Sequence, residues 1–300
     1  TVDDRWHLGS CTKAMTATLL GILTDEKRLH FDLALGEVLK EPEFELSPEC
    51  APITLRQLLE HRAGLSTRIP PLIWARMWAA SDQHAVRSEA VRALLLGAPP
   101  RAPGEAFEYA NSGYMIAGVV AERVTGKDWE TLMRERIFTP LGMTSAGFGA
   151  PGDAAELDQP WGHRADGDHD PVPPGRTGDN PPSLGPAGTV HASLRDWSRF
   201  LAQHADAASD KTLVSAQTLA ALHDPGDDDY ALGWKVTKRQ WAKGKVLTHT
   251  GSNTMWFAVA WVAPGRGLAV FATCNQGGDD AARACDAACA MLLREIGVLR

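Results

Sequence analysis

The segment from Ser10 to Thr24 carries one charged residue, Lys13, in an otherwise largely apolar stretch. A helix that is apolar on all sides is normally buried. We therefore expect a buried helix near the start of the chain, with the amine of Lys13 inside the protein. Because burial favours the neutral amine over the ammonium, the pKa of Lys13 should fall toward neutrality.

Ser10 lies three residues before Lys13, so on a helix the two side chains share one face. A neutral amine beside a serine hydroxyl can take the serine's proton, which makes the serine a nucleophile. The pattern S-x-x-K has only two fixed positions and occurs by chance in most chains of this length. The pair therefore needs support from residues elsewhere in the sequence.

Composition and charge argue against several classes of protein. The chain has 300 residues and a formal net charge of −7, whereas a nucleic-acid partner requires a basic face. No apolar run approaches the roughly 20 residues that a membrane-spanning helix needs. No signal peptide opens the chain, but it begins with Thr rather than Met, so we expect a processed or trimmed N-terminus.

Motifs for metals and cofactors are weak in this sequence. The five cysteines form no C-x-x-C pair, and Cys285 and Cys289 are expected to be small buried apolar residues of a helix, while Cys11 adjoins Ser10. The His and Asp residues between 163 and 170 lie among Gly and Pro, which provide no rigid platform for a metal. Residues 147–152 match G-x-G-x-x-G, but no strand precedes them. We expect neither a metal nor a cofactor.

The first two-thirds of the chain is mostly helical in pattern, and the last third has the pattern of strands. Helices are predicted at residues 53–61, 81–96, 114–124 and 128–137. Short runs rich in Val, Trp, Phe and Thr predict strands at residues 231–236, 245–250, 255–262 and 268–274. Residues 279–298 predict a helix that covers one sheet face. This order predicts an α+β fold with an antiparallel sheet flanked by helices.

We expect the chain to divide into two regions. Residues 10–230 should form a mainly helical region, and residues 1–9 together with 231–300 a region of sheet and helix. Within the first region, residues 147–189 contain nine Gly and eight Pro and few apolar residues. A connection of this length in a compact protein is usually functional or mobile. We expect an ordered excursion over the surface that roofs a cleft.

Two later motifs support the Ser10 and Lys13 pair. They are Tyr109-Ala110-Asn111 and, at the end of a predicted strand, His249-Thr250-Gly251. With S-x-x-K, Y-x-N and H-T-G in this order, the chain resembles the serine β-lactamase and penicillin-binding-protein superfamily, above all its class C β-lactamase, DD-peptidase and family VIII esterase branch. Residues 55–65, 107–114, 124–126 and 140–143 are also similar to the usual runs of that group.

The resemblance implies a role for each motif residue. Ser10 would attack an acyl carbon, and Lys13 and Tyr109 would share the roles of base and acid. Asn111 would bind an amide of the substrate, and the backbone N–H groups of Ser10 and Ser252 would form the oxyanion hole. The remaining substrate-binding residues implied by the resemblance are His249, Thr250 and Gly251, the last of which lets a peptide-like ligand approach the strand edge.

The chain departs from the group at its N-terminus. Members carry several dozen residues before the S-x-x-K serine, which supply a helix and two strands of the central sheet, whereas nine residues precede Ser10 here. We therefore expect the usual N-terminal strands to be missing and a sheet edge to be left uncovered. We expect such an edge to be exposed, to be occupied by another chain through self-association, or to be covered by non-standard packing.

His249 is a second departure, because many β-lactamases have Lys at this position. A histidine titrates near neutrality, so we expect a pH-dependent anchor for a substrate carboxylate. The resemblance implies a serine hydrolase that forms an acyl-enzyme with a β-lactam or a D-Ala-type peptide or amide. A carboxylesterase of the same fold and a non-catalytic binder of peptidoglycan-like ligands stay open. The resemblance also implies a bacterial protein that is periplasmic or secreted.

Overall fold

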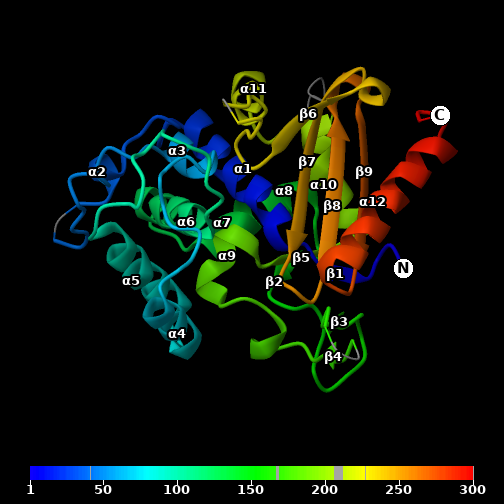
Figure 1. The fold of residues 1–300 in the computed structure, drawn as a ribbon, viewed down its shortest axis with the longest axis horizontal. Coiled ribbons are helices and arrows are strands. Elements are labelled where there is room, and N and C mark those ends of the chain that lie inside the picture. Colours follow the sequence, from blue (N-terminus) through cyan, green and yellow to red (C-terminus); the bar gives the residue numbers. More distant parts are fainter. Residues whose placement is uncertain (41, 167–168, 206–211, 227, 300) are drawn as a thin grey trace.

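Helix α1 (Thr12–Asp25) runs through the middle of the molecule, between a group of helices and a sheet (Figure 1). The computed structural model describes residues 1–40, 42–166, 169–205, 212–226 and 228–299. Residues 167–168, from the stretch considered for a metal, therefore lie outside the described part. Every residue of α1 from Thr12 to Leu23 is buried, including Lys13. The prediction of a buried helix near the start of the chain is confirmed.

The helices predicted from sequence correspond to α3, α5, α6 and α7, and the C-terminal one to α12. Helix α3 begins with a capping box in which Thr54 and Gln57 satisfy each other's backbone N–H groups. No helix in the described ranges is long and apolar enough to cross a membrane. The helices other than α1 are α2 (Leu35–Val38), α3 (Leu55–Leu59), α4 (Pro71–Ala79), α5 (Gln83–Leu95), α6 (Asn111–Thr125), α7 (Trp129–Met133), α8 (Thr139–Leu141), α9 (Gly185–Gly188), α10 (Leu194–Ala205), α11 (Ala216–Leu222) and α12 (Gly278–Glu295).

The main sheet is antiparallel, with the strand order β6–β7–β8–β9. Helix α12 covers one face and α10 packs against the other (Figure 1). Cys285 and Cys289 of α12 are buried against the sheet, which confirms their predicted role as small apolar residues. An antiparallel sheet flanked by helices is the α+β fold that the sequence predicts. The strands are β6 (Lys235–Arg239), β7 (Gly244–Ser252), β8 (Phe257–Ala263) and β9 (Leu268–Cys274).

The strand predicted at residues 231–236 is largely wrong, because β6 begins only at Lys235. Residues 231–234 form a turn in which the N–H of Ala231 donates to the carbonyl of Trp234 at 2.7 Å. Gly233 has a φ of 83°, and a Cβ there would lie 2.8 Å from Cα of Ala14 in α1. The apolar residues of this run are buried in the main core although they do not belong to the sheet, with Gly233 against α1 and Trp234 against His204 of α10.

The outer edge of β9 pairs with no other strand among the described residues, as expected from the sequence. The first strand of the chain, β1 (Arg5–His7), instead pairs with β5 (Val190–Ser193), which also pairs with β2 (Gly147–Phe148). These three strands form a separate small sheet. Pairing between β1 and β5 brings the residues before Ser10 next to the end of the Gly- and Pro-rich excursion.

That excursion, residues 147–189, lies along the lower side of the molecule in Figure 1. It contains the short strands β3 (Gly162–His163) and β4 (Pro171–Val172) and ends in the one-turn helix α9. Helix α9 packs tightly against both α1 and α6. The hydroxyl of Thr16 donates to the carbonyl of Pro186 at 2.8 Å, and a Cβ at Gly118 would lie 2.4 Å from Cγ of Pro186.

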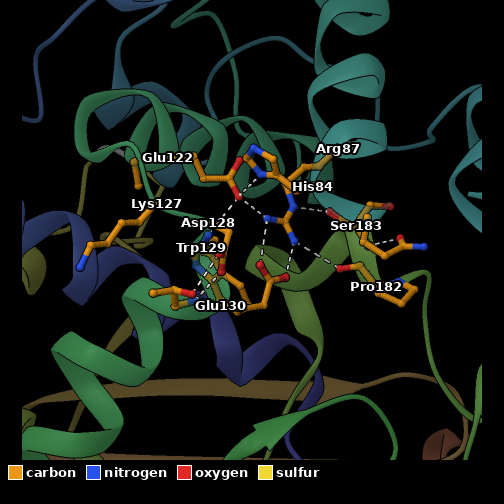
Figure 2. Close-up of polar contacts among 12 residues, drawn as sticks. His84, Arg87, Glu122, Lys127, Asp128, Trp129, Glu130, Pro182 and Ser183 are labelled. Carbon is orange, nitrogen blue, oxygen red and sulfur yellow. Dashed lines mark hydrogen bonds and ion pairs between the residues drawn. The ribbon is translucent and has the colours of Figure 1, made fainter. Parts of the chain in front are cut away.

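A buried charge cluster fixes the segment that leads into α9 (Figure 2). Arg87 of α5 is fully buried. Its guanidinium pairs with two carboxylates, those of Glu122 on α6 and Glu130 on α7. Its Nε donates to the carbonyl of Ser183 at 2.9 Å, and one Nη lies 3.4 Å from the carbonyl of Pro182. The cluster therefore joins α5, α6 and α7 to the backbone just before α9.

Burial alone would lower the pKa of Arg87, but the two carboxylates outweigh it and the pKa is raised. The guanidinium therefore stays charged in an interior where an unpaired charge is costly. Glu122 additionally accepts from the backbone N–H of Trp129 at 3.0 Å. Removal of Arg87 would leave these carboxylates without their cation and free the segment before α9.

We predict that Arg87→Met destabilises the protein by about 3–5 kcal/mol, because breaking a buried pair leaves its partner uncompensated. The matched control is Arg76→Met, since Arg76 of α4 forms an exposed ion pair with Glu89 of α5, the helix that also carries Arg87. Exposed pairs contribute about 0–1 kcal/mol. Urea unfolding of both variants measures the difference. Equal losses of unfolding free energy in the two variants would contradict the conclusion that the buried ion pairs of Arg87 stabilise the fold.

Candidate active site

Ser10 and Lys13 meet where a turn of 3-10 helix, Gly9–Cys11, leads into α1. The Nζ atom of Lys13 lies 3.0 Å from Oγ of Ser10, within hydrogen-bond distance. Ser10 is partly exposed, whereas Lys13 is fully buried beneath it. The hydroxyl can therefore meet a substrate while the amine is kept away from water.

Two further groups contact the amine of Lys13. The Oδ1 atom of Asn111, at the start of α6, and the backbone carbonyl of Ala187, in α9, each lie 2.7 Å from Nζ. A neutral amine has two N–H groups and one lone pair. If both N–H groups donate to these two oxygens, the lone pair is left to face the hydroxyl of Ser10.

Burial lowers the pKa of Lys13 from 10.5 to about 7, and the neighbouring Cys11 opposes this shift only weakly. The direction agrees with the expectation from the sequence. At neutral pH a large fraction of Lys13 is thus the neutral amine, which is the form that accepts a proton. The geometry and the pKa together suit Lys13 to the role of general base toward Ser10.

Tyr109 lies on the other side of Ser10. Its hydroxyl is close enough to Ser10 for Ser10 to influence its pKa, and its ring centroid is 4.8 Å from Nζ of Lys13. Burial raises the pKa of Tyr109 well above its ordinary value, and the proximity of Ser10 opposes this shift. Tyr109 is therefore a neutral phenol in the free protein, able to donate a proton and poorly suited to accept one.

His249 of β7 is buried next to this group, and the expectation that it titrates near neutrality is wrong. Burial, together with the nearby Lys13, lowers the pKa of His249 to about 3. Its Nδ1 donates to the carbonyl of Thr250 at 2.6 Å, so its Nε2 is free of hydrogen and accepts from the hydroxyl of Tyr230 at 2.9 Å. The ring is a neutral hydrogen-bonding group in the free protein.

The end of β7 packs directly on the turn that carries Ser10. A Cβ at Gly251 would lie 2.0 Å from the carbonyl oxygen of Leu8 and 2.7 Å from the backbone N of Ser10. A Cβ at Gly9 would lie 2.3 Å from the backbone N of Ser252. The two glycines therefore bring the backbone N–H groups of Ser10 and Ser252 close together, as an oxyanion hole requires.

A comparison with protein families agrees with this arrangement. The family model described as Beta-lactamase matches residues 1–291. The chain belongs to the beta-lactamase family. Its superfamily, which includes the penicillin-binding proteins, consists generally of serine hydrolases, and the homologues support a serine hydrolase of this fold.

Relatives in the beta-lactamase family are distant in sequence. Penicillin-binding protein 4 of Amycolatopsis lactamdurans is 28% identical over 290 residues, which cover 92% of this chain and 74% of that protein. Unguisins hydrolase ungD' of Aspergillus campestris is 27% identical over 297 residues, which cover 92% of this chain and 53% of that protein. The chain thus spans about half the length of the second relative.

Solved structures show the same fold. An octameric penicillin-binding protein homologue from Pyrococcus abyssi has a TM-score of 0.75 and 23% identity, covering 98% of this chain and 67% of that one. A D-stereospecific amidohydrolase from Streptomyces has a TM-score of 0.73 and 22% identity, covering 93% of this chain and 84% of that one. The match extends over nearly the whole chain, so the fold is that of this family.

The structure does not bring every residue of the three family motifs to the same place. Side chains alternate along β7, so His249 and Gly251 face Ser10, whereas Thr250 and Ser252 point to the other side. Thr250 is exposed and lines a surface cavity with Thr248 of β7 and Asp286 of α12. Thr250 and Ser252 can therefore contribute their backbone groups to the site more readily than their side chains.

Cys11, which adjoins Ser10, is buried on a different face of the helix turn. Its Sγ lies 3.6 Å from the carbonyl oxygen of His249. Burial raises the pKa of Cys11 to about 12, so the thiol is not a nucleophile at neutral pH. Cys11 packs α1 against β7 and takes no direct part in the chemistry.

Sequence reasoning missed three groups at the site. The carbonyl of Ala187 has no side-chain signature. Tyr230 holds His249, and His61 accepts a hydrogen bond from the N–H of Ala110 at 3.1 Å, just before Asn111. The ring of His61 contacts all three tyrosines of the chain, with centroids 4.2–5.3 Å away. The sequence has only three tyrosines, and this small number could have directed attention to Tyr230.

Proposed function

We propose that the chain is a serine hydrolase that works through an acyl-enzyme on Ser10, with a β-lactam or a D-amino-acid peptide or amide as substrate. One observation carries this proposal. The amine of Lys13 has oxygen partners for both N–H groups of its neutral form and stands 3.0 Å from the hydroxyl of Ser10. Family membership and the aligned relatives support the same chemistry.

The reaction follows from the positions of these groups. As Oγ of Ser10 attacks the acyl carbon, its proton passes to Nζ of Lys13. The negative charge that develops on the acyl oxygen is met by the N–H groups of Ser10 and Ser252. The neutral phenol of Tyr109 lies beside Oγ and supplies a proton to the leaving group. The proton on Lys13 then passes to the phenolate of Tyr109, which restores the neutral amine and the neutral phenol. Water hydrolyses the ester on Ser10 with Lys13 again serving as base, and Lys13 returns that proton to Oγ as the acid product leaves.

The end of β7 suits a peptide-like substrate. Strand β6 pairs with β7 only as far as Thr248, so on this side residues 249–252 pair with no strand in the described part of the chain. An extended substrate can add to this edge as a strand does. The side-chain amide of Asn111 can donate to a substrate carbonyl. The names of two relatives, a penicillin-binding protein and a D-stereospecific amidohydrolase, support this substrate class.

A carboxylesterase of the same fold is the second candidate, and the state of His249 favours it. A cation at this position would attract the carboxylate of a β-lactam or a peptide. His249 is neutral at pH 7, because its pKa is about 3. A substrate carboxylate therefore finds no cation at His249 to bind to. Binding of an uncharged ester is not weakened, because it needs no such cation. A non-catalytic binder remains the third candidate.

We predict that the protein forms a covalent adduct on Ser10 with an activated phosphonate or a penicillin. Peptide mapping by mass spectrometry should place the added mass on Ser10, and Ser10→Ala should give none. The control is Cys11→Ala, which should label as the parent protein does because the thiol is protonated. An unlabelled parent protein would contradict both the β-lactam or peptide hydrolase and the carboxylesterase, and would leave the non-catalytic binder as the candidate function. Turnover of a chromogenic cephalosporin against a short-chain nitrophenyl ester then ranks the two enzymes.

We predict that acylation follows the protonation of Lys13. The pKa of Lys13 is about 7, and only its neutral form accepts the proton of Ser10. The value of kcat/KM for the preferred substrate should therefore rise about tenfold per pH unit below pH 7 and level off above it. The pH profile of initial rates measures this. A rate that stays constant down to pH 5 would contradict Lys13 as the base.

A further inference from the structure

Asp179, at the end of the Gly- and Pro-rich excursion, lies behind the turn of Ser10. The residue is 8% exposed, and its Oδ1 accepts from Nδ2 of Asn253 at 3.0 Å and from the N–H of Asn180 at 2.7 Å. The Nε2 of His7 lies 2.8 Å from the same oxygen. The ring N–H is not aligned with this oxygen well enough for a regular hydrogen bond, so this contact is a short electrostatic one.

His7 connects Asp179 to the turn of Ser10. It is fully buried in β1, and its Nδ1 accepts from the backbone N–H of Gly9 at 3.1 Å. With Nδ1 as the acceptor, the hydrogen of a neutral ring is on Nε2, the atom that faces Asp179. Gly9 has a φ of 49° and no room for a Cβ against Ser252. The orientation of the N–H of Ser10 thus depends on how His7 holds Gly9.

Asn253 connects Asp179 to the other half of the oxyanion hole. It directly follows Ser252, is 5% exposed, and also donates to the carbonyl of Gly178 at 3.2 Å. The next residue, Thr254, has a φ of 75°, which is strained for a β-branched side chain. Strain of this kind persists only where surrounding contacts over-determine the backbone. The bonds from Asn253 to Asp179 and Gly178 are such contacts.

We propose that Asp179 is a positioning residue that aligns the backbone N–H groups of Ser10 and Ser252 toward one oxyanion. This inference rests on the proposed acyl-enzyme function. The two N–H groups come from opposite ends of the chain, and a catalytic site tolerates errors of only about 0.5 Å. One buried carboxylate contacts both supports, His7 on one side and Asn253 on the other. Asp179 sets their relative position and does not itself touch the substrate.

The test uses the full chain and the ester or β-lactam that labels Ser10. Asp179→Asn keeps the size of the side chain and removes its charge. We expect kcat to fall about 10–100-fold, since misplacing or losing one oxyanion donor costs about that much. The KM should change less than about threefold. The Kd of a boronic acid that mimics the tetrahedral intermediate should rise by the same factor as kcat/KM falls.

Two further variants keep the test decisive. Asp158→Asn is the matched control, because Asp158 lies in the same excursion and pairs with Arg5 of the same strand β1, but at the surface. It should leave kcat within about twofold of the parent. Asn253→Ala removes the hydrogen bond from Asn253 to Asp179 and should also lower kcat. This variant tests the inference even if Asp179→Asn does not fold.

The outcomes separate this inference from the proposed function. If the parent protein labels on Ser10 while Asp179→Asn unfolds more easily but keeps its kcat and boronic acid affinity, Asp179 is only structural and the inference is overturned. An equal loss of kcat in Asp158→Asn would overturn it as well. If the parent protein forms no adduct on Ser10, the proposed function fails first.

Discussion

The site depends on one unfavourable interaction, the burial of the Lys13 amine beneath Ser10. Burial moves the pKa of Lys13 from 10.5 to about 7, which corresponds to about 5 kcal/mol. Between these two pH values the unfolded chain binds a proton that the folded protein does not, so stability is lower at neutral pH than it would be near pH 10.5. The core around α1 must offset this cost. In return, a lysine becomes a base at neutral pH.

The rest of the fold holds the partners of that amine in place. Asn111 begins α6, and Ala187 lies in α9, which packs against Thr16 of α1. The charge cluster around Arg87 joins α5, α6 and α7 to the backbone before α9. On the far side of Ser10, Asp179 links β1 to the end of β7. Helices thus hold the proposed base, and the strands and the excursion hold the backbone N–H groups that we propose receive the oxyanion.

Local patterns predicted much of this structure, and long-range contacts did not. The apolar run after Lys13 predicted α1, the helical pattern of residues 53–61 predicted α3, and residues 268–274 form β9 as expected. The predicted site residues lie close together apart from the side chains of Thr250 and Ser252. Pairing of β1 with β5 joins segments remote in sequence, and residues 231–234 have the apolar pattern of a strand because they are buried in the main core. The carbonyl of Ala187 and the pKa of His249 depend on the folded environment, which no short motif encodes.

The most direct test of the account is the pKa of Lys13 itself. NMR of protein labelled with 13C at the lysine side chains can follow each Cε shift with pH, and Lys13→Met identifies the signal of Lys13. We expect this signal to titrate near pH 7, far below the value of about 10.4 that an unperturbed lysine has. A Lys13 signal that titrates at about pH 10.4 would mean an ammonium at neutral pH, and would contradict the claim that burial turns Lys13 into the base for Ser10.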